Sequence, residues 1–195
     1  MTKLLVSAAF AAAIIAPSAA AAQSVPAAVI AVVDLERVTT DCTACKSAKA
    51  ALTSQATAEQ NKERSLVAPL ETEQKAIQAA VDALNGKETD AALQTRVKTF
   101  QTRYQSAQQE AARGRQQLQA NQAYISKQIN DKLGPIYQTV MQRRGANVLL
   151  ETGATLATTT SVDVTNDVLA ALNSALPTVA TVAPAVPKPA TPQGR

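Results

Sequence analysis

Apolar and polar positions divide the chain into regions with different periodicities. Residues 28–34 are apolar at nearly every position, which predicts a short buried strand. From 43 to 143 the composition changes to Ala, Gln, Lys and Glu, which favour helix. Asn85-Gly86 is the one strong turn signal in this stretch. We therefore predict two long antiparallel helices that meet at this turn.

The second of these helices carries the clearer repeat. Its apolar and small residues alternate in steps of four and three, which indicates a heptad seam with a partner helix: Leu93, Val97, Phe100, Tyr104, Ala107, Ala111, Gly114 and Leu118. The same stepping in the first helix passes through Glu59, Glu63 and Glu73, so the seam is expected to be weak midway. Pro69 predicts a kink in the first helix, and Gly134-Pro135 predicts a bend or break in the second.

Beyond the second helix the pattern returns to strand and then to a short helix. Residues 145–151 read as a helix stop followed by a second strand, and 155–160 are a short β-prone stretch. A last helix is predicted to begin with Asp163 or Thr165 as its cap and to end near Leu176.

The predicted strands lie far apart in the sequence but at the same end of the helical hairpin. They are expected to pair in a β-rich body formed by 23–42 and 144–176, from which the hairpin of 43–143 projects. A body of about 50 residues is near the lower limit for independent stability, so we expect it to oligomerise. The strand residues expected to mediate this association are Ile30, Val32, Val148, Leu149 and Leu150. The predicted fold class is mainly α with a small β-body and a long antiparallel coiled-coil hairpin.

Both ends of the chain differ from the regions between them. Residues 1–22 combine Lys3, a run of about 12 apolar residues and a small-residue cleavage pattern, which predicts a signal peptide cut before Gln23 and export of the protein. Export suggests the periplasm if the source is a Gram-negative bacterium. From 177 to 195 the chain is rich in Pro, Ala, Thr and Val, a composition that predicts disorder.

Composition excludes several classes of chemistry. The 195 residues include no His and no Trp, and only 3% are aromatic. Histidine-based triads, histidine metal sites and imidazole acid–base catalysis are therefore excluded. No P-loop motif is present. We expect no enzymatic activity, no cofactor and no metal.

The reactive-looking motif is the pair Cys42 and Cys45, which are separated by two residues. In an exported protein such a pair is expected to be oxidised, and the simplest interpretation is a disulfide that staples the junction between strand and helix. A thiol–disulfide exchange site is the alternative, but the surrounding thioredoxin-like pattern is missing. Interchain bridging and metal binding are further alternatives, although two cysteines supply only half of a zinc site.

Positive charge is concentrated in the hairpin. The whole chain has a formal charge of +4, and 43–143 contain fourteen Lys and Arg against nine Asp and Glu. Five cations of the second helix, which we call the basic arm, are candidate client-binding residues: Arg96, Lys98, Arg103, Arg113 and Arg115. The basic arm would steer acidic polypeptides, although a solvated helix face is the alternative. Nucleic acid is not expected as a partner, because aromatics are sparse and no recognition motif is present.

Three stretches together resemble a known family. The strand of 30–34, the segment of 147–151 and the closing segment of 161–169 resemble the Skp/OmpH family of periplasmic chaperones over roughly 28–176. This resemblance implies a jellyfish-like homotrimer, in which the strands of three chains build a β-body and three hairpins surround a cavity. It also implies an ATP-independent holdase that binds unfolded outer-membrane β-barrel proteins during their transit to the outer membrane.

The resemblance does not cover every feature, and other functions stay open. Neither the cysteine pair nor the Pro/Ala-rich tail belongs to the family pattern, so neither takes a role from it. The principal alternative is a structural coiled-coil spacer of the cell envelope, followed by a redox protein that works through the cysteines. The basic arm also allows peripheral contact with an anionic membrane or lipopolysaccharide.

Overall fold

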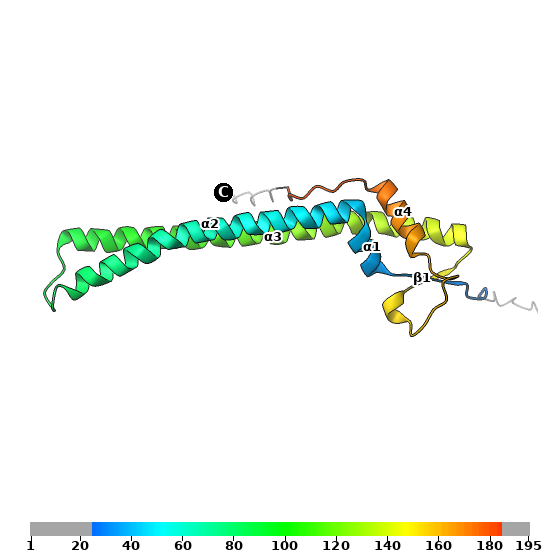
Figure 1. The fold of residues 1–195 in the computed structure, drawn as a ribbon, viewed down its shortest axis with the longest axis horizontal. Coiled ribbons are helices and arrows are strands. Elements are labelled where there is room, and N and C mark those ends of the chain that lie inside the picture. The colour runs from blue at the N-terminus through cyan, green and yellow to red at the C-terminus, as the bar shows by residue number, and fades with distance from the viewer. Residues whose placement is uncertain (1–24, 185–195) are drawn as a thin grey trace, which may run out of the picture.

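The long hairpin is the dominant feature of the computed structural model, which describes residues 25–184. Helices α2 (Thr43–Asp82) and α3 (Ala91–Arg144) run antiparallel over most of its length (Figure 1). The predicted mainly helical fold with long helices and a small sheet is confirmed. The predicted signal peptide and its cleavage before Gln23 lie outside the described residues, as do residues 185–195.

Local sequence explains where the two long helices end. Asn85 and Gly86 adopt φ angles of 47° and 84° in the turn, a left-handed conformation that Asn and Gly tolerate best. Asp90 then caps α3 by accepting a hydrogen bond from the Leu93 amide at 2.7 Å. At the other end of α3, Gly145 takes a φ of 66°, and its left-handed conformation ends the helix.

The prolines do not break either helix. Pro69 lies inside α2 and Pro135 lies inside α3, and both helices are assigned as continuous through them. The predicted break at Gly134-Pro135 is therefore wrong. Gly134 has no Cβ to contact the proline ring, and Leu133 and Ile136 on either side of the dipeptide are buried, so packing holds the helix together.

The sheet is small and parallel. Strand β1 (Ile30–Val33) pairs with β2 (Val148–Glu151), with Ile30 opposite Val148. On its other edge, the Val32 amide donates to the Val162 carbonyl and its carbonyl accepts from the Val164 amide, both at 2.8 Å. Parallel strands need a long crossover connection, and the whole hairpin provides it here.

Two predictions for the body are wrong. The stretch 155–160 is not a strand: it follows the short 3-10 helix η1 (Thr152–Ala154), and 156–160 are exposed, because the open edge of β1 is paired by 162–164 instead. The segment before the hairpin is not purely β-rich either, because 35–41 form helix α1 (Leu35–Asp41). Asp34 caps this helix by accepting from the Arg37 amide at 2.8 Å.

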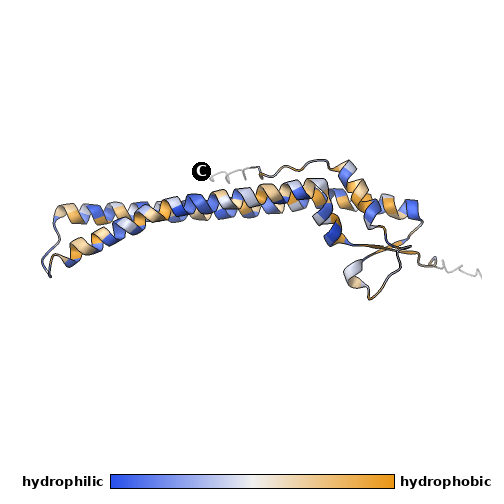
Figure 2. Cartoon of the chain, viewed as in Figure 1, coloured by the Kyte–Doolittle hydropathy of each residue, from blue (hydrophilic) through white to orange (hydrophobic). Residues whose placement is uncertain are grey.

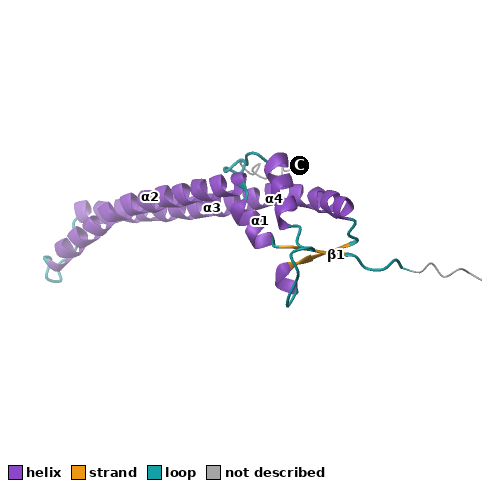
Figure 3. Cartoon of the chain, turned by 45° about the vertical axis from the view of Figure 1, so that its right-hand side comes forward, coloured by secondary structure: helices purple, strands orange, loops and turns teal. Residues whose placement is uncertain are grey.

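The hydrophobic core lies where the hairpin meets the body. Helix α4 (Thr165–Ala175) packs across α3, and α1 lies beside it (Figure 3). Apolar residues gather on α4, whereas polar residues dominate the middle of the hairpin (Figure 2). The most buried residues of the core include Val38, Cys42, Val140, Val168 and Leu172.

The first part of the C-terminal tail is ordered against the hairpin, which corrects the prediction of disorder from residue 177. After α4 the chain turns back and runs beside α2 and α3 without forming a helix or strand (Figure 1). Val179 packs against the hydrophobic core, and Ala180 is hydrogen bonded to Gln128. This segment forms no helix or strand, so side-chain amides of the hairpin supply hydrogen-bond partners for its backbone.

Candidate functional site

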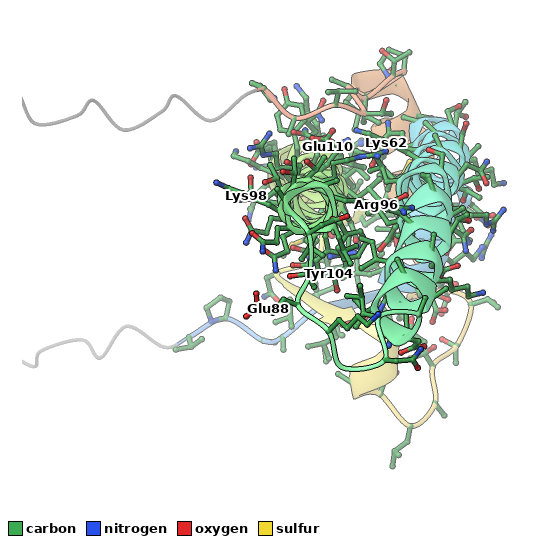
Figure 4. The ribbon with its side chains drawn as sticks, turned by 90° about the vertical axis from the view of Figure 1, so that its left-hand side faces the viewer. Lys62, Glu88, Arg96, Lys98, Tyr104 and Glu110 are labelled. Atoms are coloured by element: carbon green, nitrogen blue, oxygen red, sulfur yellow. A yellow bond between two sulfur atoms is a disulfide. The ribbon has the colours of Figure 1, made fainter. Side chains whose placement is uncertain are left out.

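The distal part of the hairpin, away from the sheet, carries the candidate surface. Beyond Ala48, only Leu70 is buried among the described residues of α2. In α3 the predicted seam residues Leu93, Ala107 and Gly114 are buried. Tyr104, however, is 47% exposed, so its prediction as a closed seam residue is wrong. Figure 4 shows Tyr104 at the side of α3.

An apolar groove forms around this tyrosine. The Phe100 and Tyr104 rings stack with centroids 6.0 Å apart, and Val67 on α2 is 40% exposed. These side chains and Leu70 line a cavity of about 520 Å³ between the helices, together with polar groups of Glu63, Gln74 and Arg115. We call this cavity the aromatic groove. Its chemistry suits apolar side chains without requiring a particular shape.

The glutamates in the predicted seam of α2 form ion pairs across the hairpin. Glu73 accepts from Arg96 Nε at 2.6 Å and from its Nη2 at 3.2 Å, and Glu63 accepts from Arg115 at 3.0 Å. The hydrogen bond from Arg96 lowers the pKa of the Glu73 carboxyl from its ordinary 4.5. These carboxylates therefore link the helices at the edge of the seam, instead of being buried within it.

A third ion pair across the hairpin lies next to Arg113, a member of the basic arm. Lys62 on α2 donates to Glu110 on α3 at 2.5 Å, and Arg113 lies 3.8 Å from the same carboxylate (Figure 4). The hydrogen bond from Lys62 lowers the pKa of Glu110. Arg113 is 72% exposed, so this contact leaves most of its guanidinium in solvent.

The basic arm is therefore divided by what each cation contacts. Arg96 and Arg115 are paired with carboxylates of α2, whereas Lys98 and Arg103 make no ion pair within residues 25–184. Figure 4 shows Arg96 directed toward α2 and Lys98 directed away from it. The free cations are the ones available to an incoming polyanion or acidic chain.

Gly114 leaves room for Glu59, the remaining glutamate of the predicted α2 seam. A Cβ at this position would collide with the Glu59 carboxylate and lie 2.8 Å from its Cδ. Glycine in the interior of α3 is therefore explained by the close approach of a partly buried side chain from α2.

The cysteines occupy the junction between α1 and α2. Cys42 and Cys45 form a disulfide, and the exposed fractions of the two residues are 0% and 7%. Cys42 Sγ also accepts from the Cys45 amide at 3.0 Å and so caps α2. A disulfide enclosed in this way offers little surface for attack by a thiolate, which does not favour the exchange alternative.

The strand residues predicted for oligomerisation divide between two faces of the sheet. Leu149 packs against the hydrophobic core with Ala31 and Val33. Successive residues of a strand point to opposite faces, so the remaining four lie on the other face: Ile30, Val32, Val148 and Leu150. On this second face Ile30 is 44% exposed, whereas Val32 is buried.

In the part of the chain that the structure describes, no three metal-ligating side chains gather, and no helix is long and apolar enough to cross a membrane. The aromatic groove is the feature that heptad spacing alone missed. The sequence did contain a signal for it: Val67 and Leu70, on either side of Pro69, are apolar residues of the first helix that lie opposite the two aromatics.

Comparison with known proteins gives the chain its family. A family model described as outer membrane protein (OmpH-like) matches residues 29–172. A crystal structure of an OmpH-like protein from Caulobacter crescentus, itself described as a candidate outer membrane chaperone, superposes with a TM-score of 0.68 at 19% identity. The superposition covers 84% of this chain and 94% of the Caulobacter chain. No curated protein sequence matches the chain. On the strength of the family match, this chain belongs to the OmpH-like family of outer membrane proteins.

Proposed function

We propose that the protein is an ATP-independent holdase chaperone of the periplasm, which binds unfolded outer-membrane β-barrel proteins and prevents their aggregation. The observation that carries this proposal is the aromatic groove, an open apolar surface on a hairpin arm. Lys98 and Arg103, which make no ion pair within residues 25–184, lie on the same helix as its two aromatics. Many weak apolar contacts, combined with free positive charge, bind non-native chains without sequence specificity. Membership of the OmpH-like family supports the same role.

The second face of the sheet supports a trimeric assembly. Apolar residues remain partly exposed there, and the outer edge of β2 has no partner strand among residues 25–184. An open strand edge beside an apolar surface favours association with further copies of the same chain. Three hairpins projecting from one such body would enclose a client, with their aromatic grooves available to it.

The proposal is tested by mixing the purified mature protein with a urea-denatured β-barrel protein and measuring light scattering after dilution. Suppression of aggregation is expected near one trimer per client. The variant Phe100→Ser, Tyr104→Ser should lose most of this suppression, whereas Gln101→Ser, Gln105→Ser on the same helix should retain it. Unchanged suppression by the aromatic variant would remove the aromatic groove from the mechanism.

The divided basic arm supplies a second test. Lys98→Gln, Arg103→Gln should slow the association of an acidic client by about tenfold at low salt, with little effect above 0.5 M salt. Arg64→Gln, Lys75→Gln on α2 is the charge-matched control. Equal association rates for the two variants would leave the basic arm as a solvated face. Contact of the arm with anionic lipid or lipopolysaccharide stays a prediction, which vesicle sedimentation would check.

The spacer alternative is distinguished by the same assay. A wild-type protein that binds no denatured client at any salt concentration would leave the structural coiled-coil spacer as the better account.

A further inference from the structure

The ordered part of the tail is bound through its main chain. We call residues 177–184 the strap; it runs along α2 and α3 in the direction opposite to α3 (Figure 1). Gln128 Nε2 donates to the Ala180 carbonyl at 2.9 Å, and the Ala180 amide donates back to Gln128 Oε1 at 3.0 Å. A side-chain amide that exchanges two hydrogen bonds with one residue acts as a neighbouring strand would act.

Two further side-chain amides of the hairpin bond to the backbone of the strap. Gln55 Nε2 donates to the Thr181 carbonyl at 3.2 Å, and the Ala183 amide donates to Asn121 Oδ1 at 2.8 Å. We call Gln55, Asn121 and Gln128 the amide groove. Its hydrogen bonds with the strap reach backbone atoms only, so they would not distinguish one sequence from another.

Hydrogen bonds within the hairpin, which do not involve the strap, also orient these amides. Asn121 is only 4% exposed, and its Oδ1 accepts from Gln117 while its Nδ2 donates to Gln55, both at 2.8 Å. Gln128 Nε2 also donates to the Tyr124 carbonyl at 3.2 Å. These bonds within the hairpin fix the orientation of each amide, which lowers the entropy lost on binding a chain.

The spacing of the groove matches an extended polypeptide. Asn121 and Gln128 are seven residues apart on α3, which is about 10.5 Å along the helix. Ala180 and Ala183, their partners, are three residues apart, and three extended residues span about 9–10 Å. The strap repeats Thr-Val-Ala at the same step of three, so an alanine meets each of the two α3 amides, Gln128 and Asn121. One heptad of helix therefore presents one amide to every third residue of a bound chain.

We propose that the amide groove is a binding site for extended, unfolded polypeptide, recognised through its backbone, and that the strap is an intramolecular occupant which clients displace. This rests on the proposed holdase function and extends it, because it places a second capture site near the body, separate from the aromatic groove. The ligand is an extended segment whose backbone amides and carbonyls are free to bond, with little dependence on its side chains. A tethered occupant competes as if present at millimolar concentration, so weak client segments would not enter while the strap is bound.

The experiment measures binding of a fluorescent peptide with the sequence of residues 177–184 to the full mature chain. Ala180→Pro in the protein removes the amide that donates to Gln128 and is expected to loosen the strap, so peptide affinity should rise by at least about tenfold over wild type. Adding Gln128→Ala to this variant should abolish the gain, whereas Gln122→Ala, an exposed glutamine of the same helix, should preserve it. Equal affinities of wild type and Ala180→Pro would overturn the proposal.

Modified peptides test whether the backbone is what is recognised. N-methylation at Ala180 and Ala183 should weaken binding by tenfold or more, whereas N-methylation at Val182, whose amide makes no hydrogen bond within residues 25–184, should have little effect. A peptide with Thr178 and Val182 exchanged, both of which are exposed, should bind as well as the original. If it does not, side chains are recognised and the proposal fails. Peptide binding without suppression of client aggregation would defeat only the holdase function, and the reverse result would defeat only the amide groove.

Discussion

The two ends of the hairpin are built from similar helices but are held together differently. Near the body, α3 buries a regular series of branched residues against α4 and the start of α2: Ile125, Ile129, Leu133, Ile136 and Val140. Toward the turn, the described part of α2 buries only Leu70, and three ion pairs link the helices instead. Exposed ion pairs contribute about 0–1 kcal/mol each, so the distal arms are held far more weakly than the base.

The two ends of the hairpin are therefore suited to different roles. A tightly packed base fixes where the arms begin, and loosely joined arms leave apolar surface open to solvent. The aromatic groove lies in the weakly joined half, where Phe100 and Tyr104 have few neighbours to cover them. Regions with few buried contacts are the ones expected to open locally. An arm of this kind would adapt to clients of different size.

The largest expected effect is a cavity in the base. Leu172 is fully buried, so Leu172→Ala should lower the free energy of unfolding by about 2–5 kcal/mol in urea denaturation. Leu66→Ala in the half-buried distal seam should cost about 1 kcal/mol. Similar losses for the two substitutions would contradict the distinction between the two ends.

The disulfide belongs to the base and should have the next largest effect. Cys42→Ser, Cys45→Ser is expected to lower stability by about 1–3 kcal/mol, since the closed loop is very short. Suppression of client aggregation should be unchanged, because the cysteines lie at the junction of α1 and α2 and do not line the aromatic groove. Thiol–disulfide exchange catalysed by the wild type and absent from the variant would instead support the redox alternative.

Acid should loosen the arms before the base. The pKa values of Glu73 and Glu110 lie below their ordinary 4.5 because each accepts from a cation, so their ion pairs stabilise the hairpin fully above pH 4.5. That contribution is lost as the pH falls below 4.5 through the lowered values. In the body, hydrogen bonds from Thr165 lower the pKa of Asp163 from 3.8, so its contribution persists to lower pH.

Labels on exposed Ala79 and Ala92, on either side of the turn, would report this opening as an increased or broadened distance. Arg96→Gln, Arg115→Gln should show the same broadening at neutral pH, and high salt should reproduce part of it. A distance that stays constant between pH 6 and pH 3.5 would show that apolar contacts alone hold the arms.

The smallest expected effect is at Gly114. Gly114→Ala gains about 1 kcal/mol of helix propensity but displaces the Glu59 carboxylate, which is at the end of a flexible side chain. We expect a net stabilisation of about 0.5 kcal/mol by thermal unfolding. Combining it with Glu59→Ala, which removes the obstruction, should restore the full gain. Destabilisation by Gly114→Ala alone would mean that Glu59 is held more firmly than the weak arm implies.

Much of this architecture could be predicted because it depends on short-range sequence patterns. Composition and the Asn85-Gly86 signal were enough to expect the hairpin, and the apolar runs near 30–33 and 148–150 indicated strands at its base. Helix α1 was missed although Asp34 is a typical N-cap. The first helix was predicted to begin only at about residue 43, where the composition changes to helix-forming residues. The strand at 155–160 was wrong because the free edge of β1 is paired by 162–164 instead.

The candidate site was only half predictable. The sequence supplied the residue types, namely the cations of the basic arm, two aromatics and several seam glutamates. Spacing along one helix could not show which glutamate meets which arginine, because that depends on the register of α2 against α3. For the same reason it could not separate Arg96 and Arg115, which are paired, from Lys98 and Arg103.

By itself, the sequence determined the features that depend on neighbours along the chain: helical periodicity, turn and cap residues, and the exclusion of histidine chemistry. Tertiary structure alone decided which surfaces stay open and which are covered. The strap shows the physical reason, because a Pro/Ala-rich segment has no internal pattern that would order it. Residues 177–184 are held by groups distant in sequence: Gln55, Asn121 and Gln128 present amides to their backbone, and the core covers part of Val179.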